Sequence, residues 1–166
     1  EAKYSEDFSL QASALSEILN IKVIEELREK LGGIYGGGYR ASVEDEPYDN
    51  YSFVLQLPCG PENVDKLIAA ADEVVKDIKA NGPSVEDLDK VKNQWKEKHR
   101  LNMKKNSYWA GKLQSVLFLG RDKNHMLNYD AWVDSLTTDD IKKVANTVFD
   151  GKNIFTAILY PESEKK

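Results

Sequence analysis

A switch from helical to strand periodicity at the Gly32-Gly33 pair constrains the fold more than any other feature of this 166-residue sequence. Before the pair, apolar residues recur every third or fourth position, and after it the pattern alternates loosely, as in a strand. Because glycine has no Cβ, it adopts the left-handed conformation that ends helices and lets two backbones approach closely. We therefore predict a long helix that turns sharply into a strand, with Arg28 in its last turns and Tyr35 at the start of the strand.

Arg28 and Tyr35 flank this one turn, so both side chains can face the same space. A structural interpretation stands beside a functional one. An arginine near a helix C-terminus favours the helix dipole, and a tyrosine packs its ring while its hydroxyl finds water. Composition and spacing alone favour the structural interpretation for both residues.

The composition is that of an ordinary globular domain, with 41% hydrophobic and 31% charged residues and a net charge of −5. Lys and Arg alternate with Asp and Glu, so no basic stripe predicts a nucleic-acid partner. No apolar run predicts membrane insertion or a signal peptide. The lone Cys59 excludes an internal disulfide and suits a small hydrophobic role. Because the sequence begins at Glu1 without an initiator methionine, we expect a fragment of a longer protein.

Periodicity and capping residues predict a mixture of helices and strands in a single domain covering residues 1–166. Ser5, Ser84 and either Thr137 or Thr138 are expected to cap helices, and the charge run from Lys90 to Lys105 is interpreted as a solvated face. The expected helices are 1–31 after a short lead-in, 61–81, 84–105, 106–120, a short one carrying Trp132 and Val133, and 137–150. The expected strands are 34–44, 51–57 and 154–160.

The predicted sheet is small for the helical apolar surface that must be covered. The first two strands are expected to form an antiparallel hairpin, and the strand 154–160 lacks alternation, which predicts that both its faces are covered. Either further strands lie upstream or a partner chain supplies them. A sheet edge left open in this way could pair with a second copy, giving a homo-oligomer.

Motifs that would make this chain catalytic by itself are absent from the sequence. Only two histidines occur, His99 and His125, and neither begins a zincin motif or its inverted form, because Met103 and Tyr129 stand four residues later. We expect His99 to pack in a helix and His125 to be solvated in a loop. No serine or cysteine nucleophile is marked by a histidine base. The run Gly36–Gly38 misses the spacing of phosphate loops, and a small-molecule site there is a third interpretation.

The stretch Leu27-Arg28-Glu29-Lys30-Leu31-Gly32-Gly33-Ile34-Tyr35 resembles the Arg-Glu-Lys…Gly-x-x-Tyr signature in the C-terminal halves of the pitrilysin/insulinase (M16) family of zinc peptidases. Later segments are also similar to bacterial members of this family, and the likeness runs from about Phe8 to Pro161. These segments are Cys59-Gly60-Pro61-Glu62-Asn63-Val64, Asn81-Gly82-Pro83-Ser84 and Asn106-Ser107-Tyr108-Trp109.

This resemblance implies an α+β fold of the LuxS/metallohydrolase-like sandwich type, with an antiparallel sheet backed by helices. The family pairs two homologous halves around a peptide. One half binds zinc, and the other contributes an arginine and a tyrosine, which the motif carries onto Arg28 and Tyr35. A guanidinium can fork onto a peptide carbonyl or carboxylate, and a phenol can donate to a developing oxyanion. With the resemblance included, the functional interpretation of both residues is favoured.

The expected function is therefore that of the non-catalytic half of a zinc-dependent metalloendopeptidase, here a fragment of its C-terminal domain. The expected partners are a peptide substrate and a zinc-bearing N-terminal half, on the same polypeptide or on a partner subunit. Strands that usually open the family's C-terminal domain are missing from this sequence, as is any zinc motif, so hydrolysis by this chain alone is not expected. The alternative is a structural or peptide-holding scaffold of the same fold. The periplasm or cell envelope is the expected compartment, with the cytoplasm as the alternative.

Overall fold

The structure is a computed structural model that describes residues 3–26 and 36–162 of the chain. Helices dominate these residues, and the only sheet among them has two strands. In chain order the elements are α1 (Glu6–Val23), β1 (Gly38–Glu44), β2 (Asn50–Gln56), a 3₁₀ turn (Pro61–Asn63), α2 (Val64–Asn81), α3 (Val85–Asn102), α4 (Asn106–Leu119), α5 (Lys123–Leu127), α6 (Tyr129–Asp134) and α7 (Thr138–Val148).

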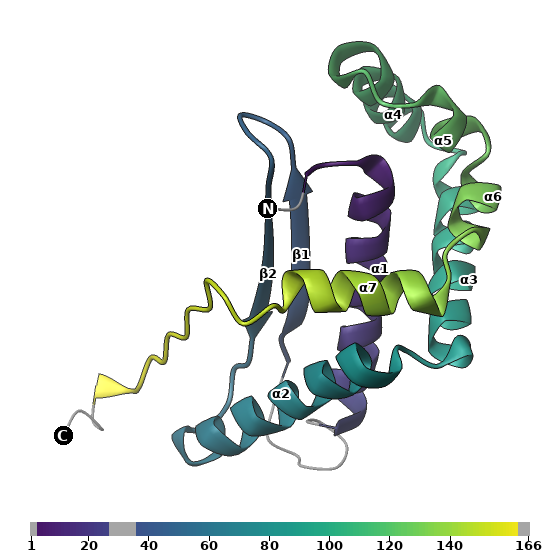
Figure 1. Cartoon of the computed structure of the whole chain (residues 1–166). Coiled ribbons are helices and arrows are strands. Elements are labelled where there is room, and N and C mark those ends of the chain that lie inside the picture. Colours follow the sequence, from purple (N-terminus) through teal and green to yellow (C-terminus); the bar gives the residue numbers. More distant parts are fainter. Residues whose placement is uncertain (1–2, 27–35, 163–166) are drawn as a thin grey trace.

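Helix α1 is the element around which the others are arranged. It lies against β1 of the hairpin and also contacts α2, α3 and α7. Figure 1 shows α7 crossing α1, while α3 runs along the side of the molecule away from the hairpin and leads to α4 and α5 at one end. The sequence predicts that the broad apolar stripe of this helix is buried against a sheet. In the structure, the sheet covers one part of this stripe, and helices α2, α3 and α7 cover the rest.

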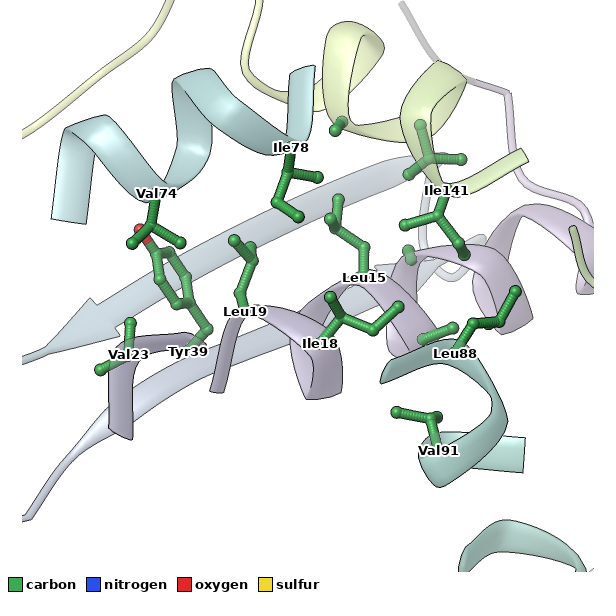
Figure 2. Packing of buried hydrophobic residues seen from close by; sticks show 14 of the residues in the cluster. Leu15, Ile18, Leu19, Val23, Tyr39, Val74, Ile78, Leu88, Val91 and Ile141 are labelled. Atoms are coloured by element: carbon green, nitrogen blue, oxygen red, sulfur yellow. The ribbon is translucent and has the colours of Figure 1, made fainter. Parts of the chain in front are cut away.

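The hydrophobic core is built on α1, where eight residues are buried. Leu15, Ile18 and Leu19 are each 0% exposed. Ala12 and Ala14 are equally buried, and such small side chains let neighbouring elements approach closely. Figure 2 shows α1 side chains meeting those from the surrounding elements. The buried partners on those elements include Tyr39, Leu67, Ala71, Val74, Ile78, Leu88, Val91, Ile141, Val144 and Ala145.

Most predicted boundaries are confirmed because local hydrogen bonds set them. Ser5 accepts from the amide of Phe8, and Thr137 forms a reciprocal capping box with Asp140. Gly82, with φ of 75°, ends α2 where the sequence predicts. The predicted end of the first helix at Leu31 lies outside the described residues, and within them the regular α-helix extends to Val23.

The predicted antiparallel hairpin is confirmed. Strands β1 and β2 pair in register from Gly38 opposite Gln56 to Glu44 opposite Asn50. Phe53 and Leu55 on β2 pack against the core from one face of the hairpin. The hairpin therefore covers α1 with apolar side chains while its turn is polar.

The predicted third strand is wrong for the described structure, because residues 154–160 form no regular element. Neither face of this segment is covered: Phe155, on one side of an extended chain, is 88% exposed, and Ile154, on the other, is 75% exposed. An extended segment becomes a strand only when a neighbour pairs with its backbone, and no element among the described residues does so. The apolar composition of the segment is thus not matched by burial in this chain.

Replacing Ile18 with alanine is expected to lower the free energy of unfolding by about 3 kcal/mol, because the residue is fully buried between α1 and its neighbours and a cavity would remain. Urea denaturation of the purified chain measures the change. Val85, 67% exposed at the start of α3, provides the matched control. Val85→Ala should stay within about 0.5 kcal/mol of the parent, and an equal loss in both variants would contradict this account of the core.

Candidate functional site

The two residues that the sequence singles out, Arg28 and Tyr35, lie outside the described residues, as do Gly32 and Gly33. The structure therefore describes the two flanks of the predicted corner: α1 with the three residues that follow it as far as Glu26, and the chain from Gly36 into β1. The contacts that these two flanks make are the structural information on the site.

One side chain ties the two flanks together. The amide nitrogen of Asn20 in α1 donates to the carbonyl of Tyr39 at 3.0 Å, and its amide oxygen accepts from the backbone amide of Tyr39 at 2.6 Å. Both backbone polar groups of one β1 residue are thus satisfied by a single carboxamide. This two-bond clamp holds the last part of α1 beside the first part of β1.

Glycines make the close approach at this corner feasible. Gly37 and Gly38 have φ of 96° and 137°, values that side chains rarely permit. A Cβ on Gly37 would collide with the carbonyl oxygen of Gln56, and one on Gly38 would collide with the amide oxygen of Asn20. Other groups of the protein therefore approach the backbone closely at these two positions.

Tyr39 follows the glycines and belongs to the core rather than to an exposed site. Its side chain is 7% exposed and its ring meets Phe149 edge to face at 6.3 Å. Burial, with a smaller contribution from the charge of Asp72, raises the pKa of its phenol well above the usual range. The hydroxyl therefore stays protonated at physiological pH.

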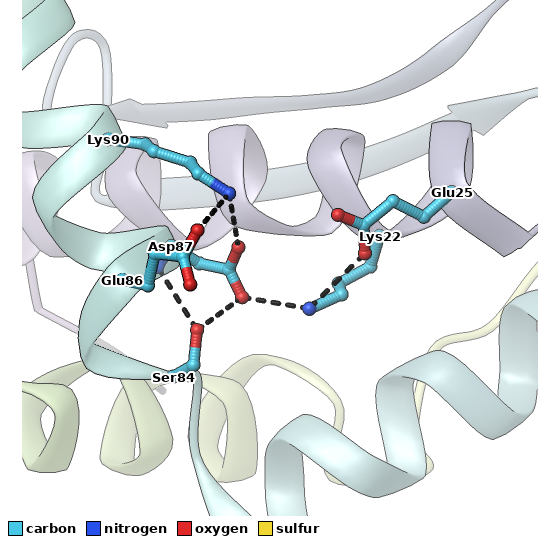
Figure 3. Close-up of polar contacts among 6 residues, drawn as sticks. All are labelled: Lys22, Glu25, Ser84, Glu86, Asp87 and Lys90. Carbon is cyan, nitrogen blue, oxygen red and sulfur yellow. Dashed lines mark hydrogen bonds and ion pairs between the residues drawn. The ribbon is translucent and has the colours of Figure 1, made fainter.

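A buried ion pair fixes the same end of α1 to α3 (Figure 3). Lys22 lies 2.8 Å from a carboxylate oxygen of Asp87, whose side chain is 4% exposed. The Ser84 hydroxyl donates to that carboxylate at 2.6 Å, and Lys90 lies 3.8 Å from its other oxygen. Burial alone would raise the pKa of Asp87. The hydrogen bonds from Lys22 and Ser84 and the nearby positive charges outweigh that effect and lower it.

A second polar cluster joins the start of α1 to α5 and α6. Glu6 accepts from the backbone amide of Asp122 at 2.7 Å, and its other oxygen lies 3.1 Å from Nδ1 of His125. The ring of His125 stacks on Trp132 with 3.9 Å between centroids. The prediction of a solvated loop histidine is therefore wrong. Asp122 caps α5 by accepting from the amide of Asn124, and this places His125 in a helix that reaches α1.

His99 packs between helices, as the sequence predicts. Its Nδ1 lies 2.6 Å from the Tyr108 hydroxyl, and its ring stacks on Tyr129 with 4.4 Å between centroids. Burial lowers the pKa of His99 and raises the pKa of Tyr129 to about 12. Both groups are therefore neutral at pH 7, and they join α3, α4 and α6.

Neither a metal site nor a membrane-spanning helix is found among the described residues. Among residues 3–26 and 36–162, no group of three or more His, Cys, Asp or Glu side chains could hold a metal ion. No described helix has the length and apolar character needed to cross a bilayer. Cys59 packs against the core as a partly buried side chain.

Sequence reasoning missed the two contacts that shape the corner. Asn20 and Lys22 interrupt the apolar stretch Ile18–Val23, and a polar residue at such a position is the signal that could have indicated a buried hydrogen-bond partner. Asp87 stands three residues after Ser84, the residue expected to cap this helix. Its pairing with Lys22 joins segments far apart in the sequence, so no local pattern predicts it.

Comparison with protein families gives a match over more than half of the chain. The model described as the peptidase M16 inactive domain matches residues 3–95. Among curated proteins, the chloroplastic stromal processing peptidase of Pisum sativum is 28% identical over 136 residues. The aligned part is 80% of this chain and 11% of that protein, so the chain spans about a tenth of the relative.

Solved structures share the fold. The periplasmic protease PqqL from Escherichia coli superposes with a TM-score of 0.75 at 18% identity, covering 90% of this chain and 16% of that one. A peptidase M16 inactive domain from Pseudomonas fluorescens gives 0.73 at 19% identity, covering 87% of this chain and 35% of that one. These likenesses confirm the predicted α+β class.

Gly38→Ala is expected to lower the free energy of unfolding by about 2 kcal/mol, because the new methyl group collides with the Asn20 amide at a φ that alanine disfavours. Gly111→Ala in α4 is the matched control, since nothing lies within 4 Å of the added Cβ. There, alanine should stabilise the helix by about 0.5–1 kcal/mol. Chemical denaturation of both variants tests the clamp, and a neutral result for Gly38→Ala would contradict it.

Asp87→Asn is expected to lower the free energy of unfolding at pH 7 by about 2 kcal/mol, because the buried hydrogen bonds lose their charged acceptor. A carboxyl whose pKa is lowered by folding stabilises the protein above its unfolded pKa of about 3.9 and loses that effect as the pH falls through the folded value. The difference between parent and variant should therefore shrink in acid. Asp89→Asn, exposed on the same helix, is the control. Urea titrations across this pH range measure both, and a constant difference would contradict the assignment.

Proposed function

We propose, because this chain belongs to the family of peptidase M16 inactive domains, that it is the non-catalytic half of a zinc-dependent metalloendopeptidase. Residues 1–166 then form one domain, a part of the C-terminal half of the parent enzyme. In this proposal the chain contributes Arg28 and Tyr35 to a peptide site whose zinc lies on another domain.

The observation that carries the proposal is the clamp between Asn20 and Tyr39. It fixes α1 beside β1 on both flanks of the segment 27–35. In the sequence, Arg28 follows the described residue Glu26 by two positions, and Tyr35 directly precedes Gly36. The Lys22–Asp87 pair and the glycine run make these flanks firmer. Two anchored ends are what a pair of substrate-contacting groups requires for defined positions.

The chemistry suits a partner in peptide hydrolysis. A guanidinium offers parallel N–H donors that match a carboxylate or, with one arm, a peptide carbonyl. A phenol donates one hydrogen bond to the oxygen on which negative charge develops when the peptide bond is attacked. Zinc activates water and polarises a carbonyl when an enzyme binds it. The described residues of this chain do not fit a zinc ion, since no three donors converge there.

The proposed partners follow from this assignment of the zinc to another domain and of Arg28 and Tyr35 to this chain. The zinc-bearing N-terminal half belongs to the same polypeptide or to a partner subunit, and the ligand is a peptide. The likeness to PqqL, a periplasmic protease, supports a periplasmic or cell-envelope location for this chain, with the cytoplasm as the alternative.

Tyr35→Phe, made in the complete protein that carries this chain, is expected to lower kcat/KM for peptide hydrolysis about 100-fold through the loss of one oxyanion donor. Arg28→Gln is expected to act mainly by raising KM, because the guanidinium binds substrate. Cleavage of a quenched fluorescent peptide measures both effects, with thermal unfolding recorded beside each assay.

The matched controls lie on the hairpin. Tyr48 is 69% exposed at its turn and Arg40 is exposed on β1, so Tyr48→Phe and Arg40→Gln should leave kcat/KM unchanged. If Tyr35→Phe and Arg28→Gln leave cleavage as it was, the two residues are not part of a peptide site. A parent protein that holds peptides without cleaving them would support the scaffold alternative instead.

A further inference from the structure

Helix α4 exposes an apolar stripe that nothing in the described chain covers. None of its residues is buried, and Leu117 and Phe118 are each 82% exposed, with Leu113 at 46%. Ala110, Leu113 and Leu117 are spaced as one face of a helix, three and four residues apart. Figure 1 shows the helix at the end of the molecule beyond α3. Contiguous exposed apolar side chains of this kind mark interaction surfaces.

The opposite side of α4 is tied to the body of the protein. The Tyr108 hydroxyl bonds to His99 at 2.6 Å, and the Trp109 indole donates to the carbonyl of Met103 at 2.8 Å. The Lys112 ammonium lies 5.7 Å from the ring centroid of Tyr108 and 5.8 Å from that of Tyr129. The stripe therefore faces outward because polar and aromatic contacts hold the other face.

The chain around this stripe is basic. From Lys98 to Arg121 the sequence holds six Lys or Arg and no Asp or Glu, although the whole chain carries a net charge of −5. Arg121, the last of the six, pairs with Asp45 of the hairpin turn at 2.6 Å. The run from Lys90 to Lys105 is expected to be a solvated face. In the structure, some of its basic side chains form ion pairs and others are exposed without one. Lys90, Lys96 and Arg100 pair with carboxylates. Lys98, Lys104 and Lys105 are exposed and form no ion pair with a carboxylate of the described residues, although the Lys105 ammonium donates to the side-chain oxygen of Asn102 at 2.9 Å.

We propose that the α4 surface, defined as Ala110, Leu113, Leu117 and Phe118 with Lys98, Lys104 and Lys105, docks an acidic amphipathic segment of a partner protein. The apolar side chains of such a segment cover the stripe, and its Asp and Glu residues meet the unpaired lysines. Burial of the stripe supplies affinity, and the complementary charges select the partner and speed its encounter. The segment is recognised through apolar side chains at helical spacing, as amphipathic helices are.

Charge also favours a protein segment over an anionic bilayer or a second copy of the chain. An anionic bilayer would lie across the whole end of the molecule, where the acidic turn 45–49 between β1 and β2 also lies (Figure 1). A peptide over the start of α4 meets Lys104 and Lys105, whereas Asp45 of that turn pairs with Arg121 beyond the end of α4. A symmetric pair of copies would bring two surfaces with the same excess of positive charge together, and that repulsion disfavours it.

This docking is independent of the proposed peptide site, because it uses neither Arg28 nor Tyr35. The probe is a fluorescein-labelled synthetic peptide of about 18 residues with leucines at helical spacing and glutamates elsewhere. The control peptide has lysine in place of every glutamate. Fluorescence anisotropy with the 166-residue chain is expected to give saturable binding of the Glu peptide, weakened by salt, and at least about tenfold weaker binding of the Lys peptide.

Variants separate the two parts of the surface. Lys104→Glu with Lys105→Glu, and separately Leu117→Ser, should each weaken binding of the Glu peptide at least about tenfold. Leu117→Met should restore it. Lys66→Glu with Lys143→Glu makes the same charge change at exposed sites on α2 and α7, and should leave binding within about twofold. Thermal unfolding and the Arg28→Gln and Tyr35→Phe variants, which should bind normally, complete the set.

Several results would overturn the proposal. These are no binding of the Glu peptide up to about 1 mM, equal binding of both peptides, or insensitivity to the α4 variants. Binding to phosphatidylglycerol vesicles that requires Leu117 and Lys104, with none to the peptide, would assign the surface to a membrane. Self-association in analytical ultracentrifugation that Leu117→Ser abolishes would assign it to a second copy.

Discussion

Burial of α1 over most of its surface is the constraint on which the remaining structure depends. Leu15, Ile18 and Leu19 are each 0% exposed, and one strand and three helices contact the helix. Polar side chains such as Glu17 occupy its exposed strip, whereas the partly buried Asn20 and Lys22 need partners on the elements that cover the helix. Their partners, the backbone of Tyr39 and the carboxylate of Asp87, hold the last part of α1 against β1 and α3.

Close contacts also explain why few residue types fit at Gly37 and Gly38, beside the proposed site. The carboxamide of Asn20 reaches β1 because Gly38 leaves room for it, and β1 reaches β2 closely because Gly37 leaves room for the carbonyl of Gln56. Packing, hydrogen bonding and backbone conformation agree at this point, and such agreement between levels is what makes one arrangement dominate.

Elements with local signals could be predicted from the sequence, and contacts between distant segments could not. Ser5, Ser84 and Thr137 cap helices through neighbours three residues away, so their positions follow from the sequence alone. His125 was expected in solvent because its contact with Glu6 joins opposite ends of the chain. The strand expected at 154–160 failed for a related reason, since strand propensity does not specify a pairing partner. Arg28 and Tyr35 came from a resemblance in sequence, and their placement remains a prediction.

The uncovered segment Ile154–Tyr160 has a consequence for handling this chain. Its seven residues, Ile-Phe-Thr-Ala-Ile-Leu-Tyr, carry no charge, no proline and no glycine, and they combine high strand propensity with near-complete exposure of Phe155 and Leu159. Stretches of this composition stack into intermolecular cross-β ladders when concentration rises. Lys152 before the segment and Pro161 with the charged residues after it are natural gatekeepers at its two ends. The solubility of the isolated chain therefore depends less on its well-packed core than on this one exposed segment.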